Sequence, residues 1–192
     1  MITEAKREVM AVLQEAADAI KQKRYFDLHA ISDHILHTII IYQDKDIVDI
    51  AVAIYAVNKI LEKEKYARHP KIKGLVKIIL DLLKETKTSL QKNDIDGFHE
   101  NLKAILENIQ NFSKSIKFYI DDVLHFARIK KGTKLYEHGL SLGKAAELVG
   151  VAKWDLMPAI GETAIHEQLI TSEQLNRKRA AFVGKMFKKR KK

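Results

Sequence analysis

The 192-residue chain has no cysteine and only two prolines. The absence of cysteine excludes disulfides, thiolate metal ligands and a cysteine nucleophile, and it fits a reducing compartment. So few prolines argue against a proline-rich linker and against a β-sandwich with many turns. No stretch approaches the roughly 18 apolar residues that a membrane-spanning helix needs. The first eight residues mix acidic and basic side chains and lack the pattern of a signal peptide, so we expect a cytoplasmic protein without membrane attachment.

Acidic residues are also missing from positions 176–192, where nine basic residues gather. The whole chain has 34 basic and 25 acidic residues, which leaves 25 basic residues to balance the 25 acidic ones outside this tail. The tail therefore carries the entire net charge of +9. Such an arm is suited to binding the phosphates of a nucleic acid or an acidic partner. The alternative is a solvated terminus that only keeps the protein soluble. The tail residues expected to contact nucleic acid are Arg177, Lys178, Arg179, Lys185, Lys188, Lys189 and Arg190.

Apolar residues recur at steps of three and four over residues 1–131, which predicts an all-α fold. Ile39-Ile40-Ile41 has strand propensity, but the residues around it keep the helical step. We predict an N-terminal bundle of about five helices, with Gly132 as the first break in the fifth. A helix-turn-helix-like module at 132–170 and a basic extension at 171–192 follow. The expected helices lie near residues 3–20, 27–42, 44–61, 72–82 and 94–131.

Residues 141–161 have the spacing of a helix-turn-helix. Ser141 is suited to cap a short helix over Leu142–Val149, and Gly150 follows where that helix must turn. Ala146 is small where two helices would cross closely, and Leu156 supplies an apolar contact from the second helix. The second helix of such a pair lies in the major groove of DNA, although the same spacing also serves as a packing device between domains.

This segment also resembles a known family. Gly139-Leu140-Ser141-Leu142-Gly143-Lys144-Ala145-Ala146-Glu147-Leu148-Val149-Gly150-Val151, followed by Lys153-Trp154-Asp155-Leu156, is similar to small prokaryotic helix-turn-helix proteins of the antitoxin-like type. The resemblance covers about residues 133–165 and leaves the first 130 without a counterpart. It implies binding to DNA, often to the protein's own promoter. The module residues expected to contact DNA are Ser141, Lys144, Lys153 and Trp154.

Three residues depart from an ideal recognition helix. Pro158 removes a backbone donor and predicts a short or kinked second helix. Asp155 places a negative charge near DNA, and Lys153 is the only cation on that helix. We expect Trp154 either to contact a base or partner or, more simply, to cover the small helical core.

Two candidate enzymatic sites lie in or just before the second predicted helix. His29, Asp33 and His37 are spaced by four, which would align them on one face as partial ligands for a metal. Arg24 and His29 match the Arg-x4-His spacing of the ribonuclease motif in some helical toxin domains, where arginine holds a phosphate and histidine transfers a proton. The simpler interpretation is a set of partly exposed helix residues. No phosphate loop, nucleophile elbow or dinucleotide fingerprint is present, so we expect no cofactor.

The sequence favours a DNA-binding regulator that acts as a homodimer, because one short recognition helix specifies few bases. One alternative is an interaction protein whose bundle binds a protein and whose tail contacts RNA or an acidic surface. Another is a helical ribonuclease or metal-dependent enzyme that uses Arg24, His29, Asp33 and His37.

Overall fold

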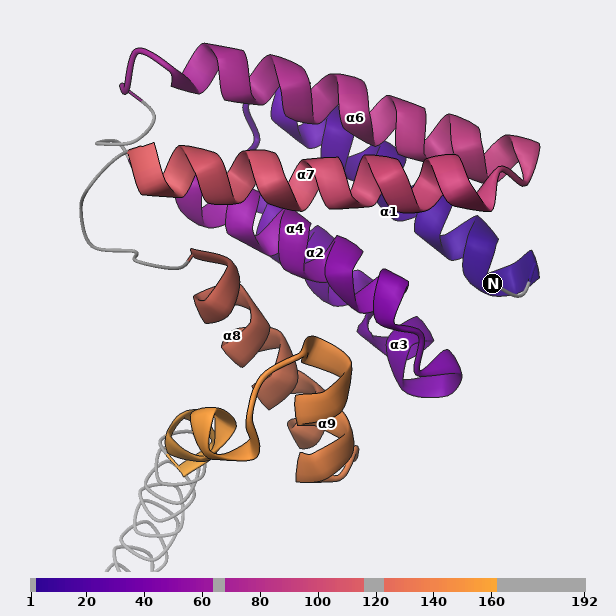
Figure 1. Ribbon diagram of the computed structural model, residues 1–192, viewed down its shortest axis with the longest axis vertical. Helices are drawn as coiled ribbons and strands as arrows, with labels where there is room; N and C mark the ends of the chain where they lie inside the picture. Colours follow the sequence, from indigo (N-terminus) through magenta and orange to yellow (C-terminus); the bar gives the residue numbers. More distant parts are fainter. Residues whose placement is uncertain (1–2, 64–67, 116–122, 162–192) are drawn as a thin grey trace, which may run out of the picture.

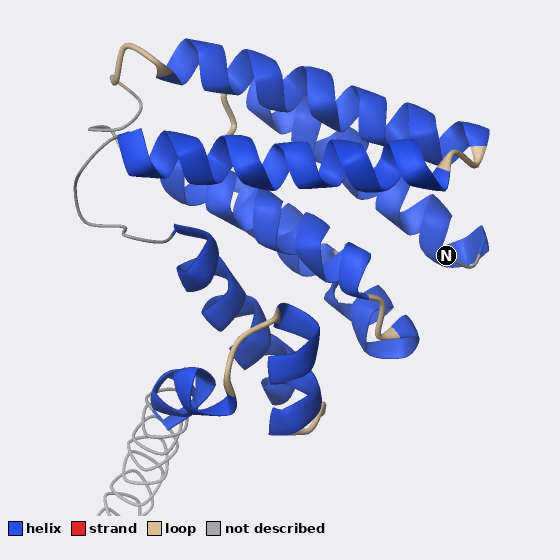
Figure 2. Ribbon diagram, viewed as in Figure 1, coloured by secondary structure: helices blue, strands red, loops and turns tan. Residues whose placement is uncertain are grey.

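The protein is all-helical. The computed structural model describes residues 3–63, 68–115 and 123–161, and within these ranges it has no strand (Figures 1 and 2). This confirms the predicted fold class. The helices are α1 (Thr3–Lys21), α2 (Asp27–His34), α3 (Leu36–Tyr42), α4 (Lys45–Glu62), α6 (Ile72–Lys92), α7 (Ile95–Ser115), α8 (Val123–Glu137) and α9 (Leu142–Val149), followed by a helical segment at 153–161.

Local sequence signals explain several helix ends. The side chain of Asp44 accepts a hydrogen bond from the Asp46 backbone N–H at 2.9 Å and caps the start of α4. Asn93 adopts a left-handed conformation (φ 58°) at the end of α6, and its N–H donates to the carbonyl of Leu90. Gln43 ends α3 in the same way, with φ 48°. These turns reverse the chain and allow neighbouring helices to pack.

The apolar stripes predicted from the sequence form the core. In α1, the side chains of Val9, Leu13 and Ala16 are at most 1% exposed. α4 is buried almost all round and contacts α2, α3, α7, α8 and α9, which explains why its sequence is apolar on more than one face. Figure 1 shows α6 and α7 side by side, with α1 and α4 packed against them. Burial of each such leucine or isoleucine contributes about 1.5–3 kcal/mol before entropy is counted.

Two predicted helices differ from the structure. The expected second helix is divided at Ile35, where the backbone (ψ −5°) leaves the regular α geometry between α2 and α3. The expected long fifth helix is also wrong, because in the described residues α7 ends at Ser115 and α8 runs in another direction from Val123 (Figure 1).

Gly132 is not a helix break. It lies inside α8 and is buried, so the expected boundary between residues 131 and 132 falls within one continuous helix. α8 packs on α4 with one part of its surface and on α9 with another. Among the described helices, none combines the length and hydrophobicity that crossing a membrane requires.

Candidate functional site

The helix α9 begins and ends as the sequence predicts. The Ser141 hydroxyl accepts a hydrogen bond from the Lys144 backbone N–H at 3.2 Å. At the other end Gly150 is left-handed (φ 69°), its N–H donates to the Glu147 carbonyl, and the N–H of Val151 donates to the Ala146 carbonyl. This pair of hydrogen bonds is a Schellman motif, which fixes the direction in which the chain leaves the helix.

The helical segment at 153–161 continues through Pro158. Its first turn is fixed by Asp155, whose carboxylate accepts a hydrogen bond from the Ala152 N–H at 3.1 Å while its own N–H donates to the Ala152 carbonyl. Asp155 therefore serves as a capping group at a helix N-terminus, where a negative charge is favourable. The chain is thus helical on both sides of Pro158, and the residues after 161, on which the length of this helix depends, lie outside the described part of the chain.

Gly132 of α8 lies where α9 and the segment 153–161 both pack against α8. A Cβ atom at this residue would lie 2.8 Å from Cδ2 of Leu156 and 3.1 Å from Cγ2 of Val149. Leu156 and Val149 are both fully buried, and Ala146 beside them is only 2% exposed. Sequence reasoning missed this role of Gly132, although a glycine within an otherwise helical pattern is itself a signal of close approach.

The outer face of the segment 153–161 is mainly apolar. Trp154 is 75% exposed and Met157 is 58% exposed, so the expectation that Trp154 covers the small core is wrong. Lys153 bends back over α9: an added Cβ at Gly143 would lie 3.4 Å from the Lys153 ammonium. This positive charge therefore lies beside the N-terminal turn of α9, whose first backbone N–H groups also favour anions.

The other predicted contact residues have varied environments. Lys144 forms an exposed ion pair with Glu147 at 2.9 Å, and Ser141 uses its hydroxyl as the helix cap. The tail residues predicted to contact nucleic acid, Arg177, Lys178, Arg179, Lys185, Lys188, Lys189 and Arg190, lie outside the described residues.

Arg128 connects α8 with α9 and α4. Its Nη1 donates to the Val149 carbonyl at the end of α9 at 2.6 Å, and its Nη2 lies 2.9 Å from Oδ1 of Asp49 in α4. Burial raises the pKa of Asp49, and the positive charge of Arg128 opposes this effect. The guanidinium thus donates a hydrogen bond to a carbonyl at the C-terminus of α9. It also balances the negative charge of the largely buried Asp49 carboxylate.

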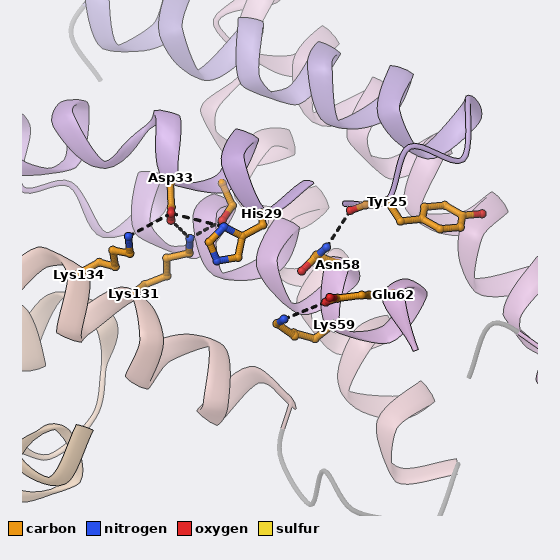
Figure 3. A network of polar contacts seen from close by, with 9 residues as sticks. Tyr25, His29, Asp33, Asn58, Lys59, Glu62, Lys131 and Lys134 are labelled. Atoms are coloured by element: carbon orange, nitrogen blue, oxygen red, sulfur yellow. Dashed lines mark hydrogen bonds and ion pairs between the residues drawn. The ribbon is translucent and has the colours of Figure 1, made fainter. Parts of the chain in front are cut away.

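Lys131, the neighbour of Gly132, forms a second connection between α8 and the bundle. Its side chain is 1% exposed, and its ammonium donates to Ser32 and, at 2.5 Å, to Oδ1 of Asp33 (Figure 3). Lys134 lies 3.5 Å from the other oxygen of Asp33. Burial lowers the pKa of Lys131 and would raise that of Asp33, but the hydrogen bond and charge from Lys131 outweigh burial and lower the Asp33 pKa.

His29 borders this network on the solvent side. Its Nδ1 lies 3.7 Å from Oδ2 of Asp33, and its ring centroid is 5.4 Å from that of Tyr55. Burial lowers the pKa of His29, with Asp33 acting in the opposite direction, and burial raises the pKa of Tyr55 to about 12. These groups line a cavity of about 120 Å³ together with Lys134.

The structure does not bring the candidate metal ligands His29, Asp33 and His37 together. His37 is exposed on α3, on the other side of the Ile35 break from His29 and Asp33, so the expected single-helix alignment is lost. The Asp33 carboxylate contacts Lys131 and Lys134 instead. The described residues contain no group of three or more histidine and acidic side chains placed to hold a metal ion.

The Arg-x4-His pair is not joined by a polar contact in the described part of the chain. Arg24 forms an ion pair with Asp27 and donates to Gln22 at 2.9 Å. His29 instead faces Asp33. The two halves of the expected ribonuclease motif therefore have separate partners.

The chain matches no protein-family model, no curated protein and no solved structure. Functional inference for this protein therefore rests on its own residues and their arrangement.

Proposed function

We propose that the protein binds duplex DNA through residues 141–161, with the basic tail supplying much of the phosphate attraction. The observation that carries this proposal is the placement of Lys153. Its ammonium lies over Gly143 beside the N-terminal turn of α9, while the outer face of the segment 153–161 is exposed. A lysine next to free helix N–H groups is suited to a phosphate, and an exposed second helix is suited to a groove.

Two sequence features that counted against DNA binding have local explanations. The charge of Asp155 is used to cap the Ala152 N–H. Pro158 leaves the described residues 153–161 helical. With Lys153 as the only cation on this segment, we expect the tail to supply affinity and the module to supply orientation and a modest sequence preference.

The direct test is a titration of labelled duplex at two salt concentrations with the full chain and with Lys153→Glu. A suitable control is Lys103→Glu, because that lysine is 77% exposed on α7, remote in sequence from the module. We expect Lys153→Glu to weaken duplex binding by about tenfold at low salt and the control to have a much smaller effect. If the wild-type chain binds neither duplex nor single strands at low salt, the proposal is wrong.

The exposed Trp154 and Met157 favour a second candidate, in which the same helix binds a protein partner. Tryptophan and methionine are enriched at protein interfaces, whereas lysine dominates contacts to phosphate. Trp154→Ala distinguishes the two functions. In the DNA-binding function it leaves the salt-dependent component of binding intact, whereas in the protein-binding function it removes the main anchor of the interface.

A further inference from the structure

A groove lies between α1 and α6, on a part of the bundle that the DNA-binding proposal does not use. It encloses about 540 Å³. α1 and α6 are neighbours in the fold (Figure 1), and residues of both helices line the groove. The partly exposed Val76 and Leu80 form its apolar floor, and the buried core residues Leu13, Ala17 and Leu83 also line it.

Lysines follow the rim of the groove. On α6 they occupy positions 73, 77, 84 and 87, and Leu80 fills the intervening turn, so the spacing of three and four places all five side chains on one stripe. At about 1.5 Å per residue, the stripe is about 21 Å long. Lys21 of α1 adds a fifth lysine from the opposite wall, and Asp81 is the only acidic residue in the lining.

The lining holds five lysines and one carboxylate, so the groove keeps an excess of positive charge. Lys21, Lys73, Lys77 and Lys84 form no ion pair with any residue that the structure describes. Lys87 donates to the neutral amide of Gln14 at 2.8 Å. Like charges gathered along one groove repel one another, which an anionic partner would relieve.

The composition of the lining indicates the class of partner. It contains no aromatic side chain and no arginine, which are the groups that stack on bases and grip phosphates in pairs. It combines aliphatic residues along the floor with lysines whose long stems can cover apolar surface while their ammonium groups reach solvent. An amphipathic helix with an apolar face between two acidic edges is complementary to both features.

We propose that the groove between α1 and α6 binds an acidic amphipathic helix of a partner protein. The 21 Å stripe corresponds to about four helical turns of the partner. Leucine-type side chains of the bound helix contact Val76 and Leu80, and its carboxylates face the lysines of α6 and Lys21. This interaction is separate from the proposed contact with DNA and does not depend on it.

The test uses the full chain and a fluorescent synthetic peptide of about 15 residues, with leucines at helical spacing and glutamates on both flanks. A scrambled peptide of the same composition controls for charge alone. We expect the patterned peptide to bind at least tenfold more tightly than the scrambled one, with an affinity that falls as salt rises. Equal binding of the two peptides, or no binding of either at low salt, overturns the proposal.

A charge-reversal variant locates the interaction. Lys73→Glu, Lys77→Glu and Lys84→Glu together should reduce peptide binding at least tenfold. The matched control is Lys92→Glu, Lys103→Glu and Lys114→Glu, which makes the same change in net charge at exposed positions outside the groove. Circular dichroism shows whether each variant is folded. If the groove variant is not folded, a variant with Lys→Gln at the same three positions is tested in its place. An equal loss in both triple variants overturns the proposal, and so does groove-dependent binding of single-stranded RNA without binding of the patterned peptide.

Discussion

Leu156 occupies the space that a side chain on Gly132 would need. The closest atom of Leu156 would lie 2.8 Å from an added Cβ, and Leu156 itself is fully buried. Close approach of the segment 153–161 to α8 therefore depends on the absence of a side chain at one position in the middle of α8.

Gly132→Ala is expected to destabilise the protein by about 1–3 kcal/mol, even though alanine is the better helix former. The added methyl group would clash with Leu156 and Val149, and burial leaves both little room to move. Urea denaturation of the variant and the wild type measures the difference in the free energy of unfolding. A variant as stable as the wild type would show that the contact is not tight.

Gly74→Ala provides the matched comparison within α6. Apart from its chain neighbours and the nearby backbone of α6, no atom of the described residues lies within 4 Å of the Cβ position at Gly74, so the substitution adds helix propensity without a clash. We expect stabilisation by about 0.5–1 kcal/mol in the same denaturation experiment. If the two substitutions change the free energy of unfolding in opposite directions, the intrinsic cost of glycine in a helix is distinguished from the need for glycine at a close contact. Destabilisation by Gly74→Ala would contradict the open surroundings of this residue.

Removing Asp33 should cost more stability than removing Lys131. Asp33→Ala leaves the Lys131 ammonium buried with Ser32 as its remaining polar side-chain partner, a change expected to cost about 3 kcal/mol or more. Lys131→Met preserves the aliphatic volume and leaves Asp33, which is 22% exposed, with Lys134 at 3.5 Å. Thermal or chemical unfolding of both variants checks the order. A larger loss in Lys131→Met would contradict the assignment of Lys131 as the buried charge that requires compensation.

The same ion pair predicts a stability change in acid. The pKa of Asp33 is lower in the folded protein than its ordinary value, so the ionised form contributes stability above that ordinary value, about 3.9. This contribution is lost as the pH falls through the lowered folded-state pKa. The difference in unfolding free energy between the wild type and Asp33→Asn should therefore be constant near neutral pH and shrink below about pH 4. A difference that is independent of pH down to strong acid would contradict the prediction.

The basic tail should dominate the salt dependence of DNA binding. A chain that ends at Gln174 lacks all nine basic residues of positions 176–192. Each phosphate contact contributes about 0.9 to the slope of log affinity against log salt, so shortening should flatten the slope by several units. Titrations of full-length and shortened chains with one duplex at three salt concentrations provide the slopes. Equal slopes would assign the phosphate contacts to the rest of the protein.

Features set by neighbouring residues were predictable from the sequence. The Ser141 cap, the left-handed Gly150 and the buried stripe of α1 each depend on residues within a few positions of one another. Their outcome in the structure agrees with the prediction because the local geometry satisfies backbone donors and acceptors directly.

Features set by distant residues were not predictable in the same way. The break at Ile35 has neither glycine nor proline to signal it. The burial of Lys131 depends on Asp33, which lies 98 positions away, and lysine is ordinarily a surface residue. The sequence predicts a helix break at Gly132, whereas in the structure this glycine allows a close contact with Leu156, which lies further along the chain.

The continuity of α8 has a consequence for cooperativity. Arg128 and Lys131 attach this helix to α4 and α2, while Gly132, next to Lys131 and about one turn after Arg128, receives Leu156. Because successive turns of one helix belong to both packing interfaces, fraying of either interface removes support from the other. We therefore expect the amide protons of α4 and α9 to exchange with solvent at similar free energies, as parts of a single folding unit.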